Sequence, residues 1–531
     1  MAATLAATAL AGCAESTRDS GGGGDKFVFA GSAEPVTLDP FFASDGESFR
    51  VSRQIFEGLV GTKPGTADPA PLLAKSWETS EDGLTYTFTL EDGVKFQDGT
   101  DFNAEAVCAN FDRWYNMPAS AQSEELTYYY GTLFRGFATG AKKDTAIYDS
   151  CTAEEGTATI KLNSPFAGFI SAMSLPAFSM QSPTALEKYQ DDAADDPRTS
   201  DYSTKHPVGT GPFKFGSWER NDRITLKRND DYWGEKAKIS EAVIVPIEEP
   251  KARADALRAG TIDGYDLVGP ADIEPLKKDG FQIVNRDAFN VLYLGINQKQ
   301  KPLDDIRVRQ AIALALNKEE IVKASMPEGT KTAVEFIPDL VNGYTDDVTK
   351  YEQDTTKAKA LLKEAGAEGA TIEFNYPTGV SRPYMPQPED TFNVIRSQLQ
   401  AIGLKIKPVA DQWDPNYLDK IQGSSKHGIH LLGWTGDYND TDNFLGVFFG
   451  SEKPEWGFDN KELFDALREA RGLPTVEEQT PAYEEINKMV MEYLPGVPIA
   501  HPVPSLAFGP DVKGYEQSPV QDEVWNKVTI N

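Results

Sequence analysis

Helix patterns and strand patterns alternate between residues 304 and 406, and this alternation is the strongest constraint on the fold. Each helix pattern has apolar residues three and four positions apart, with a capping aspartate before it or a glycine after it. Strand patterns follow two of these helices, at 371–374 and 404–406. Such alternation indicates an α/β lobe with a largely parallel sheet. The three helices are predicted, each as one continuous piece, at 304–325, 354–366 and 392–403.

The first 290 residues are richer in strand patterns. Residues 84–90 alternate large apolar side chains with threonine between two Asp-Gly turn signals, which is typical of a half-buried strand. A second strand of this kind is predicted at 223–227. The apolar runs at 291–297 and 497–503 are predicted to be buried strands.

Charge and composition exclude several classes of protein. The 531 residues include 52 Lys and Arg against 82 Asp and Glu, which gives a formal net charge of −30. Nucleic-acid-binding faces are usually basic, so no nucleic-acid partner is expected. No apolar run approaches the roughly 20 residues of a membrane span. Because 28 Phe, 20 Tyr and 8 Trp are too many for a disordered chain, we expect a large globular protein.

The N-terminal residues indicate where the protein is located. Small uncharged residues fill 1–12, as at the end of a secretory signal, and Leu10-Ala11-Gly12-Cys13 resembles the bacterial lipobox. Residues 13–26 are small, polar and Gly-rich, as in a flexible tether. We therefore expect an extracytoplasmic protein that lipidated Cys13 anchors to the outer face of the bacterial cell membrane, with no other membrane contact.

Two further cysteines, Cys108 and Cys151, remain after Cys13. In an oxidising compartment they most simply form one disulfide, which would stabilise the fold by roughly 3–4 kcal/mol. The alternative is that both are inert buried thiols.

The sequence lacks the patterns that catalysis or metal binding would need. The histidines are His206, His427, His430 and His501, with no zinc-binding motif around them. His427 and His430 have a spacing that could share a metal, but we interpret them as ordinary surface or core side chains. No Walker loop, dinucleotide fingerprint or nucleophile elbow occurs, and paired carboxylates are expected among so many acids. We expect no enzymatic activity, no metal and no cofactor.

Short motifs follow one another along the chain, and their order is far more specific than any one of them. They are 38–40 (LDP), 71–78 (PLLAKSWE), 82–88 (DGLTYTF), 93–99 (GVKFQDG), 207–213 (PVGTGPF), 228–233 (RNDDYW), 260–263 (GTID), 305–312 (DIRVRQAI) and 359–366 (KALLKEAG). In this order, over nearly the whole mature chain, the set resembles the extracytoplasmic solute-binding proteins of ABC importers for peptides, nickel and related solutes.

The resemblance implies an α/β fold with two lobes that close on a ligand like a clam, of the large peptide-binding type. The segments 291–297 and 497–503 would be the hinge crossings. The implied divisions are a signal-peptide remnant (1–12), the lipidated cysteine and tether (13–26), a first lobe (27–289) with an extra subdomain at about 58–206, a second lobe (290–498) and a return to the first lobe (499–531).

The resemblance also implies two ligand anchors of opposite charge. Asp437 matches an aspartate that pairs with a peptide's α-ammonium, which without a partner would cost several kcal/mol to bury. Arg382 matches an arginine that binds the C-terminal carboxylate of a dipeptide, and a guanidinium can do so with two parallel hydrogen bonds. Together they would admit only short zwitterions. The alternatives are a solvated loop aspartate and an arginine in an internal salt bridge.

Other residues are expected near the ligand, with core packing as the alternative for the aromatic rings. Met385 and Thr441 depart from the family pattern, which usually has Asn and Pro at these places. The expected ligand contacts besides the two anchors are Trp434, Gly436, Tyr438, Trp413 and Tyr129.

These observations favour a solute-binding lipoprotein that captures short peptides, dipeptides in particular, and acts as a monomer. Its partners would be the permease and ATPase subunits of an ABC importer. Two other hypotheses stay open. The same fold could bind a non-peptide solute, such as a nickel chelate, haem, an oligosaccharide or an opine, or the protein could be an extracellular peptide-sensing receptor.

Overall fold

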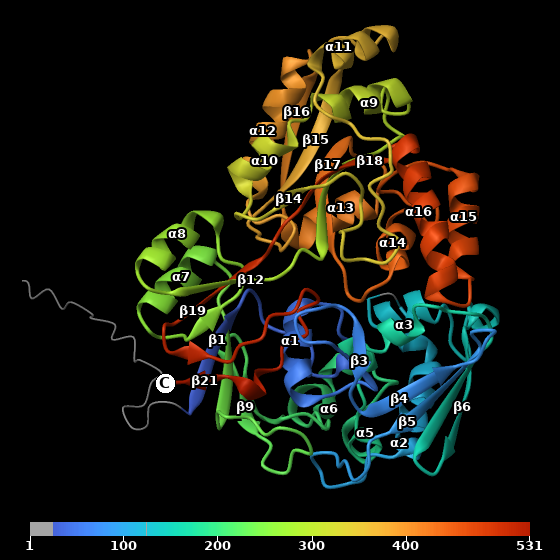
Figure 1. Cartoon of the computed structure of the whole chain (residues 1–531), viewed down its shortest axis with the longest axis vertical. Coiled ribbons are helices and arrows are strands. Elements are labelled where there is room, and N and C mark those ends of the chain that lie inside the picture. The colour runs from blue at the N-terminus through green and yellow to red at the C-terminus, as the bar shows by residue number, and fades with distance from the viewer. Residues whose placement is uncertain (1–24, 124) are drawn as a thin grey trace, which may run out of the picture.

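The computed structural model describes residues 25–123 and 125–531 and shows two lobes, one above the other in Figure 1. The predicted signal remnant, Cys13 and nearly all of the tether lie outside the described residues. The α/β two-lobed fold is confirmed. No helix in the described ranges is both long and apolar enough to cross a membrane.

A mixed seven-stranded sheet forms the base of the first lobe. Strand β1 lies near its middle and pairs in parallel with β10 and β11, whereas the outer pairs are antiparallel. In spatial order the strands are β12 (Gln282–Asn285), β19 (Ser505–Phe508), β11 (Gly264–Tyr265), β1 (Lys26–Gly31), β10 (Glu241–Pro246), β9 (Arg223–Arg228) and β8 (Phe213–Glu219).

Both faces of this sheet are buried, and β1 shows why. Because successive side chains of a strand point to opposite faces, Phe27 and Phe29 pack on one side with residues of α1 (Gly46–Ile55). Val28 and Ala30 pack on the other side with residues of α7 (Pro250–Arg258) and α8 (Pro270–Lys278). The predicted strand at 223–227 is confirmed as β9, with its two apolar side chains buried.

A four-stranded antiparallel sheet is inserted in this lobe between α1 and β8. Its strands lie in the order β4 (Ala74–Thr79), β5 (Thr85–Leu90), β7 (Thr157–Leu162) and β6 (Tyr148–Glu154). The predicted half-buried strand is confirmed as β5, where Tyr86, Phe88 and Leu90 are buried and the threonines are partly exposed. A disulfide joins Cys108 of α2 (Ala104–Tyr115) to Cys151 of β6.

The second lobe is built on a six-stranded sheet. Only β17, β15 and β16 are parallel to one another, and the other neighbours are antiparallel. The expectation of a largely parallel sheet is therefore wrong for half of the strands. β13 and β18, which connect to the first lobe, run antiparallel to their neighbours. In spatial order the strands are β14 (Lys331–Thr332), β18 (Gly496–His501), β13 (Asn290–Ile296), β17 (Ile429–Thr435), β15 (Thr371–Thr378) and β16 (Lys405–Gln412).

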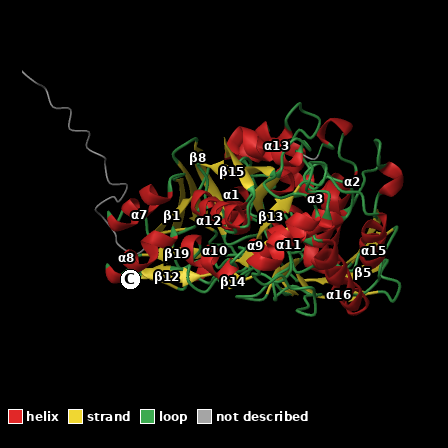
Figure 2. Ribbon diagram, turned by 90° about the horizontal axis from the view of Figure 1, so that it is seen from above, coloured by secondary structure: helices red, strands yellow, loops and turns green. Residues whose placement is uncertain are grey.

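Two of the three helices predicted from the alternation agree with the structure, as α11 (Thr355–Glu364) and α12 (Pro388–Ala401). The continuous helix predicted at 304–325 is wrong. The chain leaves helical geometry at Leu316, and the side chain of Asn317 caps a new helix. The two resulting helices are α9 (Ile306–Ala315) and α10 (Lys318–Ser325). Figure 2 shows α9 to α12 around the strands of this lobe.

The predicted hinge segments are the central strands β13 and β18, in which every residue is buried. The links between the sheets instead run through 286–289 and 502–504, where the amide of Arg286 donates to the carbonyl of Pro504 at 2.9 Å. A backbone hydrogen bond therefore joins the two chain segments that cross between the lobes.

The remaining elements are short or peripheral. The short strands are β2 (Val60–Thr62), β3 (Pro69–Pro71), β20 (Val512–Lys513) and β21 (Thr529–Ile530). The other helices are α3 (Tyr128–Leu133), α4 (Phe169–Ala172), α5 (Pro183–Tyr189), α6 (Asp201–Lys205), α13 (Leu418–Gln422), α14 (Leu445–Phe449), α15 (Lys461–Arg471) and α16 (Val476–Tyr493).

Candidate ligand-binding site

The loop after β17 carries Asp437, and tight packing fixes its course. The amide of Gly436 donates to the carbonyl of Phe289 at 2.8 Å. A Cβ at Gly436 would lie 2.5 Å from the ring of Phe289 and 2.6 Å from that of Phe444, so only glycine fits here. Gly436 thus positions Asp437 through its backbone.

The carboxylate of Asp437 is held from both lobes. Tyr129 of α3, in the first lobe, donates its hydroxyl to Oδ1 at 2.8 Å, and Asn443 of the second lobe donates to Oδ2 at 3.2 Å. No lysine, arginine or histidine forms an ion pair with Asp437 among the residues that the structure describes. Burial raises the pKa of Asp437 to about 6, and the two hydrogen bonds and the positive charge of the nearby Arg53 oppose this rise. The site therefore holds a half-buried carboxylate that has no ion-pair partner among the described residues.

Arg382 lies in a tight turn between β15 and α12. Its amide donates to the carbonyl of Met385 at 3.1 Å, and the amide of Met385 donates to the carbonyl of Arg382 at 2.9 Å. The guanidinium carbon lies 4.4 Å from the centre of the Trp413 ring. No carboxylate among the described side chains pairs with Arg382, and its buried Nε has no hydrogen-bond partner among them. The predicted alternative, an internal salt bridge, is not present among the described side chains.

The turn of Arg382 is packed against the strand that leads to Asp437. A Cβ at Gly433, in β17, would lie only 2.3 Å from the ring of Tyr384. Met385 is fully buried in the core of the second lobe, where its side chain serves packing. Two opposite charges, neither of which forms an ion pair among the described side chains, are thus tied to one strand.

Of the other predicted contact residues, three have a side chain beside an anchor or partly exposed, and one is buried in the core. Tyr129 reaches Asp437 and Trp413 reaches Arg382, as described above. Trp434 is half-buried in β17, and its indole N–H has no hydrogen-bond partner among the described residues. Tyr438, in contrast, is 1% exposed and packs in the core of the first lobe, so its ring has no surface for a ligand in this structure.

Further contacts hold the lobes together next to Asp437. Asn439 donates to Asp68 of the first lobe at 3.3 Å, and Arg471 of α15 donates to the carbonyl of Thr132 in α3 at 3.2 Å. Asp440 lies against Gly168 of the first lobe. The lobes are therefore closed on each other at this end of the cleft.

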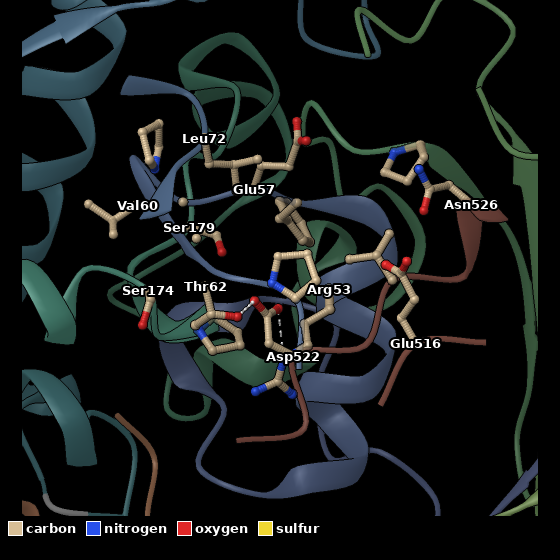
Figure 3. Close-up of a pocket in the computed structure, with 18 of the residues that line it drawn as sticks. Arg53, Glu57, Val60, Thr62, Leu72, Ser174, Ser179, Glu516, Asp522 and Asn526 are labelled. Atoms are coloured by element: carbon tan, nitrogen blue, oxygen red, sulfur yellow. Dashed lines mark hydrogen bonds and ion pairs between the residues drawn. The ribbon is translucent and has the colours of Figure 1, made fainter. Parts of the chain in front are cut away.

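A groove between the lobes opens beside the turn of Arg382. Its volume is about 440 Å³, and it is lined by Glu248, Glu249 and Pro250 of the first lobe and by 379–381 and 386–390 of the second. A separate cavity of about 280 Å³ lies within the first lobe, and Figure 3 shows Arg53, Thr62 and Asp522 in it. None of the predicted anchors lines that cavity.

Sequence reasoning missed two buried polar clusters of the first lobe. Asp266 accepts hydrogen bonds from Arg50 at 2.7 Å and from Arg286 at 2.6 Å, and these cations hold its pKa well below the usual value. Glu57 accepts hydrogen bonds from Thr210, Tyr232 and Trp233 at 2.6–2.8 Å. This shared partner explains why the motifs at 207–213 and 228–233 occur together. Neither cluster could be found from sequence spacing, because its members are far apart in the chain.

The histidine pair lies in the core of the second lobe. His427 and His430 are fully buried, and Nε2 of His430 lies 3.2 Å from a carboxylate oxygen of Glu455. Within residues 25–123 and 125–531 no group of three potential metal-ligating side chains is found.

Comparison with known proteins identifies the family of this chain. The family model described as "Bacterial extracellular solute-binding proteins, family 5 Middle" matches residues 68–456. The chain belongs to this family. Its members are extracytoplasmic solute-binding proteins, and the sequence-based assignment is therefore confirmed.

Similarity to individual proteins extends over nearly the whole chain. The dipeptide-binding protein of Escherichia coli is 31% identical over 525 residues, which cover 95% of this chain and 94% of that protein. Heme-binding protein A of Haemophilus influenzae is also 31% identical, over 95% of this chain and 92% of that protein. The Helicobacter pylori binding protein DppA, solved in complex with the peptide STSA, is 29% identical with a TM-score of 0.77, covering 95% and 98% of the two chains.

Proposed function

We propose that this protein captures short peptides, dipeptides in particular, between its lobes and delivers them to the permease and ATPase of an ABC importer. One observation carries the proposal above others. Asp437 and Arg382 are opposite charges without ion-pair partners among the described residues, and both are tied to β17. Because removing an unpaired charge from water is costly, a zwitterionic ligand that pairs with both at once would be favoured.

The relatives support this choice of ligand. Proteins named for binding dipeptides and peptides are similar to the chain over nearly its full length. A protein of this kind binds and releases its ligand unchanged, so we assign no catalytic residue. Lipidation of Cys13 would keep the monomer at the outer face of the cell membrane, and Cys13→Ala should release it into the extracytoplasmic fluid.

Calorimetry with a matched set of ligands tests the proposal. We expect a dipeptide to bind more tightly than its N-acetyl derivative or its C-terminal amide, by about tenfold to a hundredfold for each lost charge. Tri- to pentapeptides test whether both anchors limit length. If no peptide binds, while a sugar or a metal chelate binds tightly, the proposal is wrong.

A non-peptide solute is the second candidate, because a relative named for binding haem is as similar to the chain as the dipeptide-binding one. Mass spectrometry of the ligand retained by the purified protein distinguishes the two. If Asp437→Ala and Arg382→Ala both leave the affinity for that ligand unchanged, the second candidate is favoured. A peptide-sensing receptor would bind the same peptides without restoring uptake when expressed with an importer's permease and ATPase.

A further inference from the structure

Trp413 forms a platform beneath the guanidinium of Arg382. It begins a single turn of π-helix, Trp413–Tyr417, directly after β16, and such turns are rare and often occur at functional sites. The centre of its partly exposed ring lies 4.4 Å from the guanidinium carbon. The ring is therefore placed for a cation–π contact with an arginine that has no carboxylate partner among the described side chains.

The platform is itself held by the central strands of the lobe. Tyr417 stacks on Trp413, with ring centres 6.0 Å apart and planes 24° from parallel. The buried hydroxyl of Tyr417 donates to the carbonyl of Leu431 in β17 at 2.6 Å and contacts that of Asn375 in β15 at 3.2 Å. Trp413 is thus linked through Tyr417 to the strand that carries the other anchor.

An immobilised guanidinium is a better receptor for a carboxylate than a mobile one. Its planar fork binds a carboxylate through two parallel hydrogen bonds only in one orientation. A free arginine side chain loses rotamer freedom when it binds, and a side chain that is already ordered loses less. The stack on Trp413 orders Arg382 before any ligand arrives.

We propose that Trp413 is a positioning residue that orients Arg382 and thereby sets the preference of the site for ligands with a free terminal carboxylate. This inference rests on the proposed function. It concerns only the carboxylate end of the ligand, because Asp437 and Tyr129 are held by separate contacts.

The test compares three ligands on wild type and four variants. A dipeptide, its C-terminal amide and its N-acetyl derivative are titrated by calorimetry into wild type, Trp413→Leu, Trp413→Phe and Arg382→Ala. We expect Trp413→Leu to lower the ratio of acid to amide affinity by about threefold to tenfold, the worth of a cation–π contact. Trp413→Phe keeps an aromatic face and should restore most of the ratio. Arg382→Ala should abolish it, and Trp413→Leu in that background should cause no further loss.

A second arginine–tryptophan stack provides the matched control. Arg220 lies over Trp218 at the edge of the first lobe, 3.3 Å from the ring centre, and Trp218→Leu should leave the acid-to-amide ratio unchanged. The ratio of free to N-acetyl affinity should stay at its wild-type value in Trp413→Leu, because the ammonium anchor is untouched.

The outcomes separate the two proposals. If wild type prefers the acid and Trp413→Leu does so equally, the positioning role is wrong while the proposed function stands. If Trp413→Leu lowers the acid-to-amide and free-to-acetyl ratios by the same factor, Trp413 only maintains the lobe and the inference is again wrong. If wild type binds no dipeptide at all, the proposed function fails and the inference fails with it.

Discussion

At the scale of single residues, the proposed ligand anchor Asp437 is expected to lower the stability of the unliganded protein. Its pKa is about 6 in the folded chain and near 3.8 in a solvated one. Because the folded value is raised, the protonated carboxyl contributes stability that is fully present below about pH 4 and is lost as the pH rises through about 6. Above that range the folded protein carries an ionised carboxylate that forms no ion pair with the described residues.

Asp437→Asn removes the free-energy cost of burying an ionised carboxylate. We expect the variant to be more stable than wild type at pH 8 by about 1–2 kcal/mol without ligand, while peptide affinity falls by at least about tenfold. Thermal unfolding and calorimetry measure the two effects. Asp92→Asn, at an exposed carboxylate paired with Lys75, should not raise stability. A destabilised Asp437→Asn variant with unchanged affinity would contradict this account of the anchor.

The same carboxylate predicts how ligand affinity depends on pH. Because the α-amino group of a peptide loses its proton near pH 8, affinity should be highest near pH 7. A peptide ammonium binds the ionised carboxylate, so affinity should fall below pH 6 by up to about tenfold per unit. Calorimetry between pH 4.5 and 8 measures the slope. The fall should disappear in Asp437→Asn, and a fall of the same size in that variant would assign the effect to another group.

At the scale of elements, the disulfide joins a helix to the edge of the four-stranded sheet. Cys108 and Cys151 are 43 residues apart in sequence, and closing such a loop restricts the unfolded chain. We expect Cys108→Ser with Cys151→Ser to lower the free energy of unfolding by roughly 3–4 kcal/mol. Urea unfolding with and without reductant measures it. The reductant should destabilise wild type by a similar amount and leave the double variant unchanged, and an insensitive wild type would refute the prediction.

Local patterns predicted elements well where one signal dominated. Strand β5 and helices α11 and α12 followed from alternation, capping and glycine stops, because each buries one face against its own lobe. The break between α9 and α10 did not follow, because a partner distant in sequence stabilises it. The side chain of Gln398 in α12 accepts a hydrogen bond from the backbone amide of Asn317 at 3.0 Å, and no local sequence pattern contains that contact.

At the scale of the whole molecule, contacts next to Asp437 hold the lobes closed. The tightest is at Gly168, where an added Cβ would lie 2.0 Å from a carboxylate oxygen of Asp440. Gly168 has a φ of −71°, which alanine adopts without strain, so a substitution there acts through side-chain contacts. The contact with Asp440 between the lobes is the tighter one, and the ring of Phe166 in the same lobe would lie 3.1 Å from the added Cβ.

We therefore expect Gly168→Ala to open the unliganded protein. Small-angle scattering should show a larger radius of gyration than in wild type, and peptide affinity should fall because part of the binding energy is used to close the lobes. Gly131→Ala, in α3 of the same lobe, is the control, since a Cβ there meets nothing within 4 Å. An unchanged radius in Gly168→Ala would show that this contact does not limit opening.

The sequence by itself determined the family and the two-lobed α/β fold, and it is the source of the two proposed anchors, because ordered motifs and local periodicity are written along the chain. Only the tertiary structure decided what surrounds those anchors. Tyr129 meets Asp437 across 308 positions of sequence, and Tyr438 enters the core of the opposite lobe. Trp413 lies beneath Arg382 because strands β15 and β17 hold Tyr417. These contacts arise from lobe closure and core packing, which join residues that no sequence spacing relates.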